Sequence, residues 1–217
     1  MAGGPDLPYV HDSYEYMNTR SSYLDFYAYK EGEDAFADLV VKIANGAVLI
    51  DLKREKQTGM MAIHPENGNL IVGAEAPRIM DMDIIPSPYL GGMMDQFLNG
   101  MYIPSFETAR GCPFSCTFCY QGDKWFNKIA KFSVERIKAE LTYMAKKMTK
   151  FKAIELRICD SNFGMYKRDE EFGEHIRKLQ DEYGWPNAIN VSTGKGNWDR
   201  IIHIAERVRN AFSVGCS

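Results

Sequence analysis

The sequence predicts an α/β fold in which residues 101–217 form a parallel sheet of about four βα units. Short apolar segments typical of strands recur at 101–108, 153–158, 188–192 and 211–214. Between them lie segments with apolar residues at helical spacing, such as the stripe of Phe172, Ile176 and Leu179. Strands that alternate with amphipathic helices favour parallel pairing with right-handed crossovers. Four units are too few to close an eight-stranded barrel, so we expect an incomplete one.

Helix starts are visible in the same half of the chain. Ser133 precedes a stripe that runs from Val134 to Met148, and Ser is a favoured N-cap residue. Asn197 precedes a third stripe with Ile201 and Ile202, so we expect it to cap the last helix.

The residues before 101 have a less regular pattern, and we divide the chain into 1–45, 46–100 and 101–217. In the first range we expect a loop at Gly3-Gly4-Pro5, a strand at 24–29 and a helix at 33–43. The second range alternates short apolar runs with Gly, Asn and Pro, which is typical of a hairpin-like connector.

Composition narrows the classes of partner. The chain is 45% hydrophobic and 25% charged, with a net charge of -3, as in ordinary soluble proteins. A net negative charge does not indicate a basic surface for binding nucleic acid or an anionic membrane. No apolar run approaches the length of a membrane span, and the N-terminus lacks the pattern of a signal peptide. We therefore expect a cytoplasmic protein with no nucleic-acid or membrane partner.

The cysteines point to a metal centre. Three of the five lie in the segment Cys112-Pro-Phe-Ser-Cys116-Thr-Phe-Cys119, directly after the first predicted strand of the sheet. Three thiolates on one tight loop are able to ligate three corners of a cubane iron–sulfur cluster. A fourth protein ligand is not needed if a small molecule binds the last iron. Phe118 is an apolar residue suited to shielding a cluster or the edge of a cofactor.

The alternative is a zinc site or thiols without a metal. Structural zinc takes four closed ligands, often as two separated pairs, whereas only three cysteines cluster here. Cys159, at the end of the second predicted strand, is the available fourth thiol.

The cysteine segment also carries a family resemblance. The string Glu107-Thr-Ala-Arg-Gly-Cys112-Pro-Phe-Ser-Cys116-Thr-Phe-Cys119 resembles the signature of the radical S-adenosylmethionine (radical SAM) superfamily, in the subset that has a cobalamin-binding domain before the barrel. Tyr27-Ala-Tyr-Lys-Glu-Gly-Glu33 is similar to the stretch that closes the cobalamin domain. Asp83-Ile-Ile-Pro86-Ser-Pro88 is similar to the linker before the barrel.

This resemblance implies a fold and a set of cofactors. The fold is the N-terminal half or less of a partial TIM-type barrel (101–217), preceded by a connector (46–100) and the tail end of a doubly wound cobalamin domain (1–45). Cys112, Cys116 and Cys119 hold a 4Fe-4S cluster, and SAM chelates the fourth iron. One electron then cleaves SAM to a 5′-deoxyadenosyl radical. Cobalamin is a further candidate in the full-length protein, since Gly3-Gly4 is similar in position to a glycine pair beside its nucleotide tail.

The implied reaction is methyl transfer or rearrangement at an unactivated carbon of a small-molecule or natural-product substrate. The electron comes from a reductant such as flavodoxin or ferredoxin. We expect the chain to be a fragment, truncated at both ends, and we leave open whether it is active by itself. A non-catalytic iron–sulfur or zinc-binding fragment remains the alternative.

Polar residues at the carboxyl ends of the second and third strands are candidates for binding SAM. Asp160 and Asn162 follow the second strand, where family members often have a Gly-Gly-Glu run that this chain lacks. An acidic group beside the cluster suits the SAM ammonium, although both residues could instead cap the next helix. Ser192 and Thr193 end the third strand and are either ligands or turn residues. Parallel strands place Asp160 at the same edge as the cysteine loop.

Overall fold

The computed structural model describes residues 1–3, 12–194, 196–210 and 212–215, and the chain divides into two compact units, Met1–Ile79 and Met80–Ser217. The division falls inside the range 46–100 that the sequence predicts to be a connector. None of the helices in the described ranges is long and apolar enough to cross a membrane.

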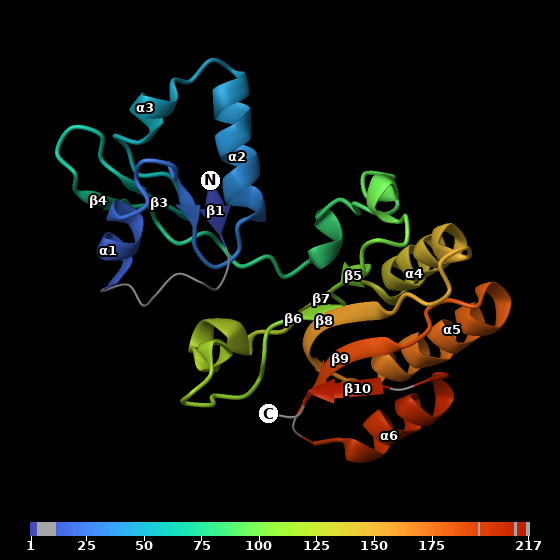
Figure 1. The fold of residues 1–217 in the computed structure, drawn as a ribbon. Helices are drawn as coiled ribbons and strands as arrows, with labels where there is room; N and C mark the ends of the chain where they lie inside the picture. The colour runs from blue at the N-terminus through green and yellow to red at the C-terminus, as the bar shows by residue number, and fades with distance from the viewer. Residues whose placement is uncertain (4–11, 195, 211, 216–217) are drawn as a thin grey trace. The chain divides into compact units, whose positions relative to one another are not determined.

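The first unit is built on a four-stranded sheet in the order β1-β2-β3-β4 (Figure 1). β1 is parallel to β2, and the other pairs are antiparallel. The strands are β1 (Ala2–Gly3), β2 (Tyr27–Ala28), β3 (Met60–Ile63) and β4 (Leu70–Val72), and the helices are α1 (Ser13–Asn18), α2 (Glu33–Ala44) and α3 (Leu49–Leu52). The helix and the hairpin predicted from sequence are therefore present.

Both faces of this first sheet are covered. Met60 and Ala62 of β3 pack into a cluster with Leu39 of α2, whereas Met61 and Ile63 pack into another cluster with Met17 of α1. All four residues of β3 are buried. Since alternate residues of a strand point to opposite faces, each face has its own apolar cover.

The second unit is built on a parallel sheet in the order β10-β9-β8-β5. Its strands are β5 (Ser105–Phe106), β8 (Leu156–Phe163), β9 (Ile189–Thr193) and β10 (Phe212–Gly215), and its helices are α4 (Val134–Met148), α5 (Arg168–Tyr183) and α6 (Trp198–Arg207). A separate antiparallel pair joins β6 (Ala109–Arg110) to β7 (Ala130–Lys131). The 3-10 turns are η2 (Met82–Ile84), η3 (Asp95–Phe97), η4 (Tyr120–Gly122) and η5 (Lys124–Asn127).

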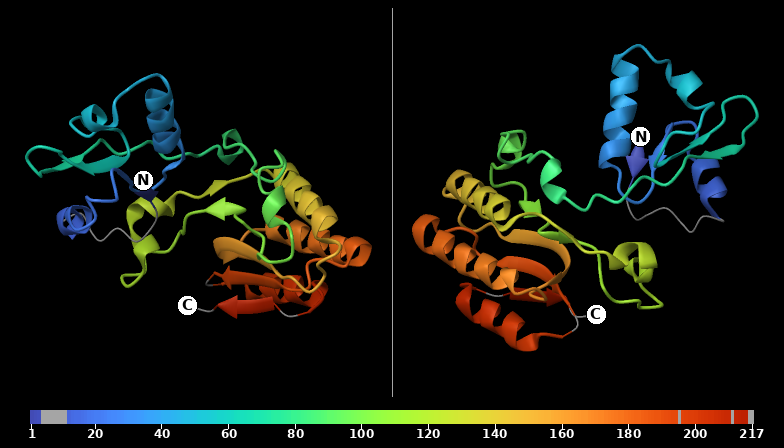
Figure 2. Two further views of the ribbon diagram at one scale, coloured as in Figure 1. Left: turned by 45° about the horizontal axis from the view of Figure 1, so that its top comes forward. Right: turned by 180° about the vertical axis from the view of Figure 1, so that it is seen from behind.

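The helices of the second unit lie along one side of its sheet (Figure 2). Leu156 and Ile158 of β8 and Val191 of β9 pack into the apolar core with residues of α4 and α5 such as Leu141 and Ile176. Arg157 and Cys159 alternate with these residues and are exposed, as is Ser192 on β9. The opposite face of the sheet is therefore polar and open in the described part of the chain.

Four local predictions need correction. Gly3 belongs to β1 and not to a loop, whereas Gly4 and Pro5 lie outside the described residues. The strand predicted at 101–108 is limited to Ser105–Phe106. The strand predicted at 24–29 is limited to Tyr27–Ala28. Asn197 precedes α6 but makes no capping hydrogen bond, because its side-chain amide donates to the Met165 carbonyl at 3.3 Å.

The second strand of the predicted barrel is longer than expected. It was predicted to end near Ile158, but β8 continues to Phe163, with a register irregularity between these two residues. Asp160 and Asn162 consequently lie inside a strand and do not cap a helix. The N-cap role of Ser133 is confirmed, since its hydroxyl accepts from the Arg136 N–H at 3.2 Å.

Candidate functional site

The three clustered cysteines lie on an excursion of the chain that two short strands close. The excursion covers residues 111–129, and the β6–β7 pair forms its base. The Cys112 N–H extends this base by donating to the Phe126 carbonyl at 2.9 Å. Gly111 has φ of 112°, a conformation that residues with a side chain rarely adopt, so the turn into the excursion depends on it.

A tight turn orders the second half of the cysteine segment. The Cys119 N–H donates to the Cys116 carbonyl at 3.1 Å, and the Gly122 N–H donates to the Cys119 carbonyl at 2.9 Å. A Cβ atom on Gly122 would lie 2.1 Å from the Cys116 carbonyl oxygen, so only glycine fits there. Phe126 packs its ring against Tyr120, with the ring centroids 5.1 Å apart.

The excursion lies at the carboxyl edge of the parallel sheet. Its first leg continues from β5, which runs parallel to β8. The coiled segment that follows the cysteines, yellow-green in Figure 1, lies beyond the ends toward which β9 and β10 point. This edge is where parallel α/β folds build their ligand sites.

The cysteine thiols have the chemistry that an iron–sulfur cluster requires. Cys112 and Cys116 are partly buried, and Cys119 is exposed. Thiolates are the ligands of such clusters, so this set of donors fits one. Among the described residues, however, no three His, Cys, Asp or Glu side chains are gathered closely enough to hold a metal ion. Cys216 lies outside the described residues.

Asp160 is at the expected edge of the sheet, but its carboxylate is already engaged. The residue is 4% exposed, and its Oδ1 atom accepts from the Thr108 N–H at 2.6 Å while Oδ2 accepts from the Thr108 hydroxyl. Burial raises the pKa of the Asp160 carboxyl to about 7, although these hydrogen bonds act in the opposite direction. This arrangement does not support the predicted contact between Asp160 and the SAM ammonium.

Two neighbouring residues that sequence reasoning missed complete this network. The Arg168 guanidinium donates to the carbonyl oxygens of Thr108, at 2.6 Å, and of Phe132. Asp169 accepts from the N–H groups of Gly164 and Tyr166, both at 2.9 Å, and so fixes the turn between β8 and α5. The acidic first turn of α5 was the available signal, but nothing in the sequence linked it to Thr108.

Ser161 is a third residue that the sequence analysis passed over. Its hydroxyl donates to Gln121 Oε1 at 2.6 Å. Gln121 stands two residues after Cys119, so this bond joins β8 to the far leg of the cysteine excursion.

The remaining predicted SAM-site residues fall into two groups. Asn162 and Thr193 are 7% and 5% exposed, and Asn162 Nδ2 and Thr193 Oγ1 have no hydrogen-bond partner among the described residues. A Cβ atom on Gly194 would lie 2.8 Å from Asn162 Oδ1, so these positions are close together. Ser192 is exposed on the open face of the sheet, and Phe118 is 79% exposed.

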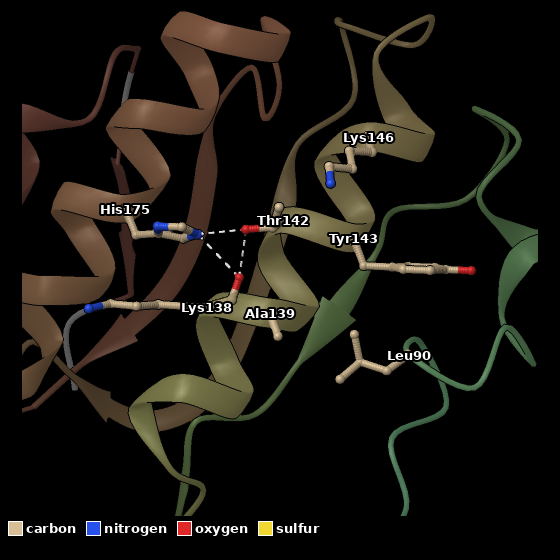
Figure 3. A pocket seen from close by; sticks show the side chains of 7 residues that line it. All are labelled: Leu90, Lys138, Ala139, Thr142, Tyr143, Lys146 and His175. Carbon is tan, nitrogen blue, oxygen red and sulfur yellow. Dashed lines mark hydrogen bonds between the residues drawn. The ribbon is translucent and has the colours of Figure 1, made fainter.

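A hollow of about 390 Å³ lies between α4 and α5 and contains none of these residues. Figure 3 shows its lining, in which His175 Nε2 and the Thr142 hydroxyl are 2.9 Å apart. Burial lowers the pKa of His175. Because His175 Nε2 of α5 also lies 3.2 Å from the Lys138 carbonyl oxygen of α4, these groups serve the helix–helix contact.

Comparison with known proteins finds methyltransferases among the relatives of this chain. It is 30% identical over 218 residues to the cobalamin-dependent radical SAM methyltransferase TokK of Streptomyces tokunonensis, covering 97% of this chain and 30% of the relative. It is also 30% identical, with the same coverage, to 2-(S-pantetheinyl)-carbapenam-3-carboxylate methyltransferase of Streptantibioticus cattleyicolor. The chain thus spans about 30% of the length of these relatives. No family model matches it.

Solved structures share the fold. The cobalamin-dependent SAM radical enzyme OxsB, with aqua-cobalamin and SAM bound, matches with a TM-score of 0.61 at 16% identity, over 98% of this chain and 30% of that one. The radical SAM methyltransferase TsrM from Kitasatospora setae, with cobalamin and a [4Fe-4S] cluster bound, has a TM-score of 0.61 at 13% identity, over 98% of this chain and 41% of that one. The chain belongs to the radical SAM superfamily, in its cobalamin-associated subset.

Proposed function

We propose that this chain is the cluster-binding part of a radical SAM methyltransferase. Cys112, Cys116 and Cys119 would hold a 4Fe-4S cluster, which supplies the electron for reductive cleavage of SAM when it is bound. The observation that carries the proposal is the set of three cysteines on one excursion at the carboxyl edge of a parallel sheet. Since these thiols are not gathered in the described structure, the excursion must close around the iron.

The residues for SAM follow from burial and from hydrogen bonding. Asn162 and Thr193 each bury a polar atom without a partner among the described residues, and such atoms gain most from a ligand. Ser192 would contact the ligand from the open face, and Phe118 would cover the cluster or the cofactor edge. Asp160 is better suited to support the site than to touch SAM, because both of its oxygens accept from Thr108.

The open face of the second sheet is consistent with the inner wall of a barrel. All-parallel sheets are nearly always covered on both faces. Helices cover one face here, whereas Arg157 and Cys159 are exposed on the other. We propose that this face is part of the inner wall of a partial barrel, with residues 101–217 as its first units. Residues 1–45 would be the tail end of a cobalamin domain and 46–100 a connector, whose β3–β4 hairpin completes the sheet of the first unit.

Methyl transfer is favoured over rearrangement because both 30% identical relatives are methyltransferases. The substrate would be a small molecule or natural product, since TsrM is described with tryptophan as its substrate. A flavodoxin or ferredoxin type of reductant in the cytoplasm would supply the electron. Cobalamin would be bound by the longer protein.

Anaerobic reconstitution with iron and sulfide tests the proposal. The protein should take up four irons per chain and, after reduction with dithionite, give the electron paramagnetic resonance (EPR) signal of a reduced 4Fe-4S cluster. SAM should change this signal and be cleaved to methionine. A protein that binds zinc and no iron would instead be a zinc-stabilised fragment. An iron-loaded protein whose signal SAM leaves unchanged would be a non-catalytic cluster carrier.

A further inference from the structure

Two consecutive residues of β8 each hold one leg of the cysteine excursion. Asp160 contacts Thr108, four residues before Cys112, and Ser161 contacts Gln121, two residues after Cys119. Both contacts therefore come from one short stretch of β8, which has a register irregularity between Ile158 and Phe163. Between these two anchors lies the whole Cys-x₃-Cys-x₂-Cys segment.

The first anchor satisfies every polar group of Thr108. This residue is fully buried, and both its N–H and its hydroxyl donate to the Asp160 carboxylate. Its carbonyl oxygen accepts from the Arg168 guanidinium at 2.6 Å and from the Phe132 N–H at 3.1 Å. Hydrogen bonds to a buried carboxylate are among the stronger ones in proteins, so this leg is held firmly.

The second anchor is a single, half-buried bond. The Ser161 hydroxyl donates to Gln121 Oε1 at 2.6 Å. Gln121 belongs to η4, whose Gly122 N–H donates to the Cys119 carbonyl. The bond therefore passes its constraint to the last of the three cysteines through one tight turn.

We propose that Asp160 and Ser161 are positioning residues that hold the two legs of the cysteine excursion so that its three thiolates are able to meet around one cluster. This inference rests on the proposed function. Three sulfurs that are not yet gathered must give up conformational freedom when they bind iron. Anchors on one rigid strand reduce that cost, because they fix both ends of the excursion before the metal arrives.

The Thr108 side chain allows a clean substitution at the first anchor. Thr108→Val keeps the shape of the side chain but removes the hydroxyl, which leaves Asp160 Oδ2 without this donor. Thr108→Ser keeps the hydroxyl and serves as the conservative rescue. We expect Thr108→Val to lose its cluster to a chelator roughly 10-fold faster than the parent, as for a lost hydrogen bond to a charged group. Thr108→Ser should behave like the parent.

Ser161→Ala tests the second anchor. This variant should fold normally, because the substitution removes only a half-buried hydroxyl. Cluster loss should accelerate roughly 5-fold, the scale of a neutral hydrogen bond. Gln121→Ala should have the same effect. The double variant should then lose its cluster no faster than either single variant, because both substitutions remove the same bond.

A matched control separates positioning from stability. Gln180 is buried and bonds Pro186 and Arg209 through its side chain, all outside the cysteine excursion. Gln180→Leu should lower the stability of the fold and leave the rate of cluster loss unchanged. The same comparison applies to the EPR line shape of the reduced cluster with SAM, which should change in Thr108→Val and Ser161→Ala but not in Gln180→Leu.

The outcomes of this experiment are distinct. If the parent protein takes up no cluster, the proposed function fails. If the parent takes up a cluster but Thr108→Val and Ser161→Ala retain it with the parent's rate and line shape, the proposed function stands and the anchors are refuted. The positioning role is also refuted if Gln180→Leu speeds cluster loss as much as the anchor variants do. It is likewise refuted if Thr108→Ser loses its cluster as fast as Thr108→Val.

Discussion

The two sheets of this protein differ in how their strands are covered. β3 of the first sheet is buried throughout, because helix and loop side chains pack on both of its faces. β8 of the second sheet is covered by helices on one face only, and its other face carries the exposed residues Arg157 and Cys159. All residues of β3 thus belong to the core, whereas the residues of β8 are divided between a core and an open polar face.

The polar residues of β8 show what this division allows. Asp160 and Ser161 hold the two legs of the cysteine excursion, and Asn162 buries an amide nitrogen that has no partner in the described ranges. A strand buried in apolar groups on both faces has no room for such residues, because each buried polar atom needs a partner. The open face makes the carboxyl end of β8 suitable for a site.

The largest expected effect tests whether the open face of β8 belongs to the metal centre. Cys112→Ala, Cys116→Ala and Cys119→Ala should each abolish iron binding after reconstitution, because each removes a thiolate ligand. Cys159→Ala, on the open face, should leave the iron content near that of the parent, and so should Cys216→Ala. Iron analysis is the measurement. Equal loss in Cys159→Ala would mean a four-cysteine site and would exclude the open iron that SAM requires.

The second prediction concerns the free energy of unfolding in urea, measured for substitutions of neighbouring residues on β3 and on β8. Met60→Ala and Met61→Ala should both lower the free energy of unfolding by about 2–5 kcal/mol, because both side chains are buried in apolar clusters. On β8 the neighbours should differ, since Ile158→Ala should cost about 2–5 kcal/mol and Cys159→Ala less than about 0.5 kcal/mol. A large cost for Cys159→Ala would show that the second face is also part of a core.

The smallest effect concerns pH and the covered face of β8. Burial raises the pKa of Asp160 from 3.8 to about 7 in the folded protein. The folded form therefore keeps a proton that the unfolded chain has already lost, so this contribution to stability is complete below about pH 4 and is lost as the pH rises through about 7. Between about pH 5 and pH 8 the parent should lose roughly 1–3 kcal/mol more than Asp160→Asn.

Asp160→Asn is the suitable reference because its amide carries no charge at any of these pH values. Asp169, whose carboxyl pKa burial also raises, is present in both proteins and its contribution cancels in the difference. Unfolding free energies that fall in parallel for both proteins would show that Asp160 does not titrate in this range.

Sequence alone determined the features that depend on residues close together in the chain. The spacing of Cys112, Cys116 and Cys119 indicated a cluster and the family. The apolar stripes of α4 and α5 predicted both helices, and the N-cap at Ser133 is confirmed. These signals are local, because a helix face or a ligand loop is written within a few residues.

The tertiary structure alone decided which way the polar residues of β8 point. Asp160, predicted to meet SAM, accepts hydrogen bonds from Thr108, 52 residues earlier in the chain, and Ser161, which the prediction passed over, donates to Gln121. A strand turns each side chain to one face or the other, and a shift of one residue exchanges the faces. The alternation of Leu156 and Ile158 with Arg157 and Cys159 indicates the core face up to Ile158, but the register irregularity between Ile158 and Phe163 interrupts that pattern, so it does not predict the facing of the polar residues that follow.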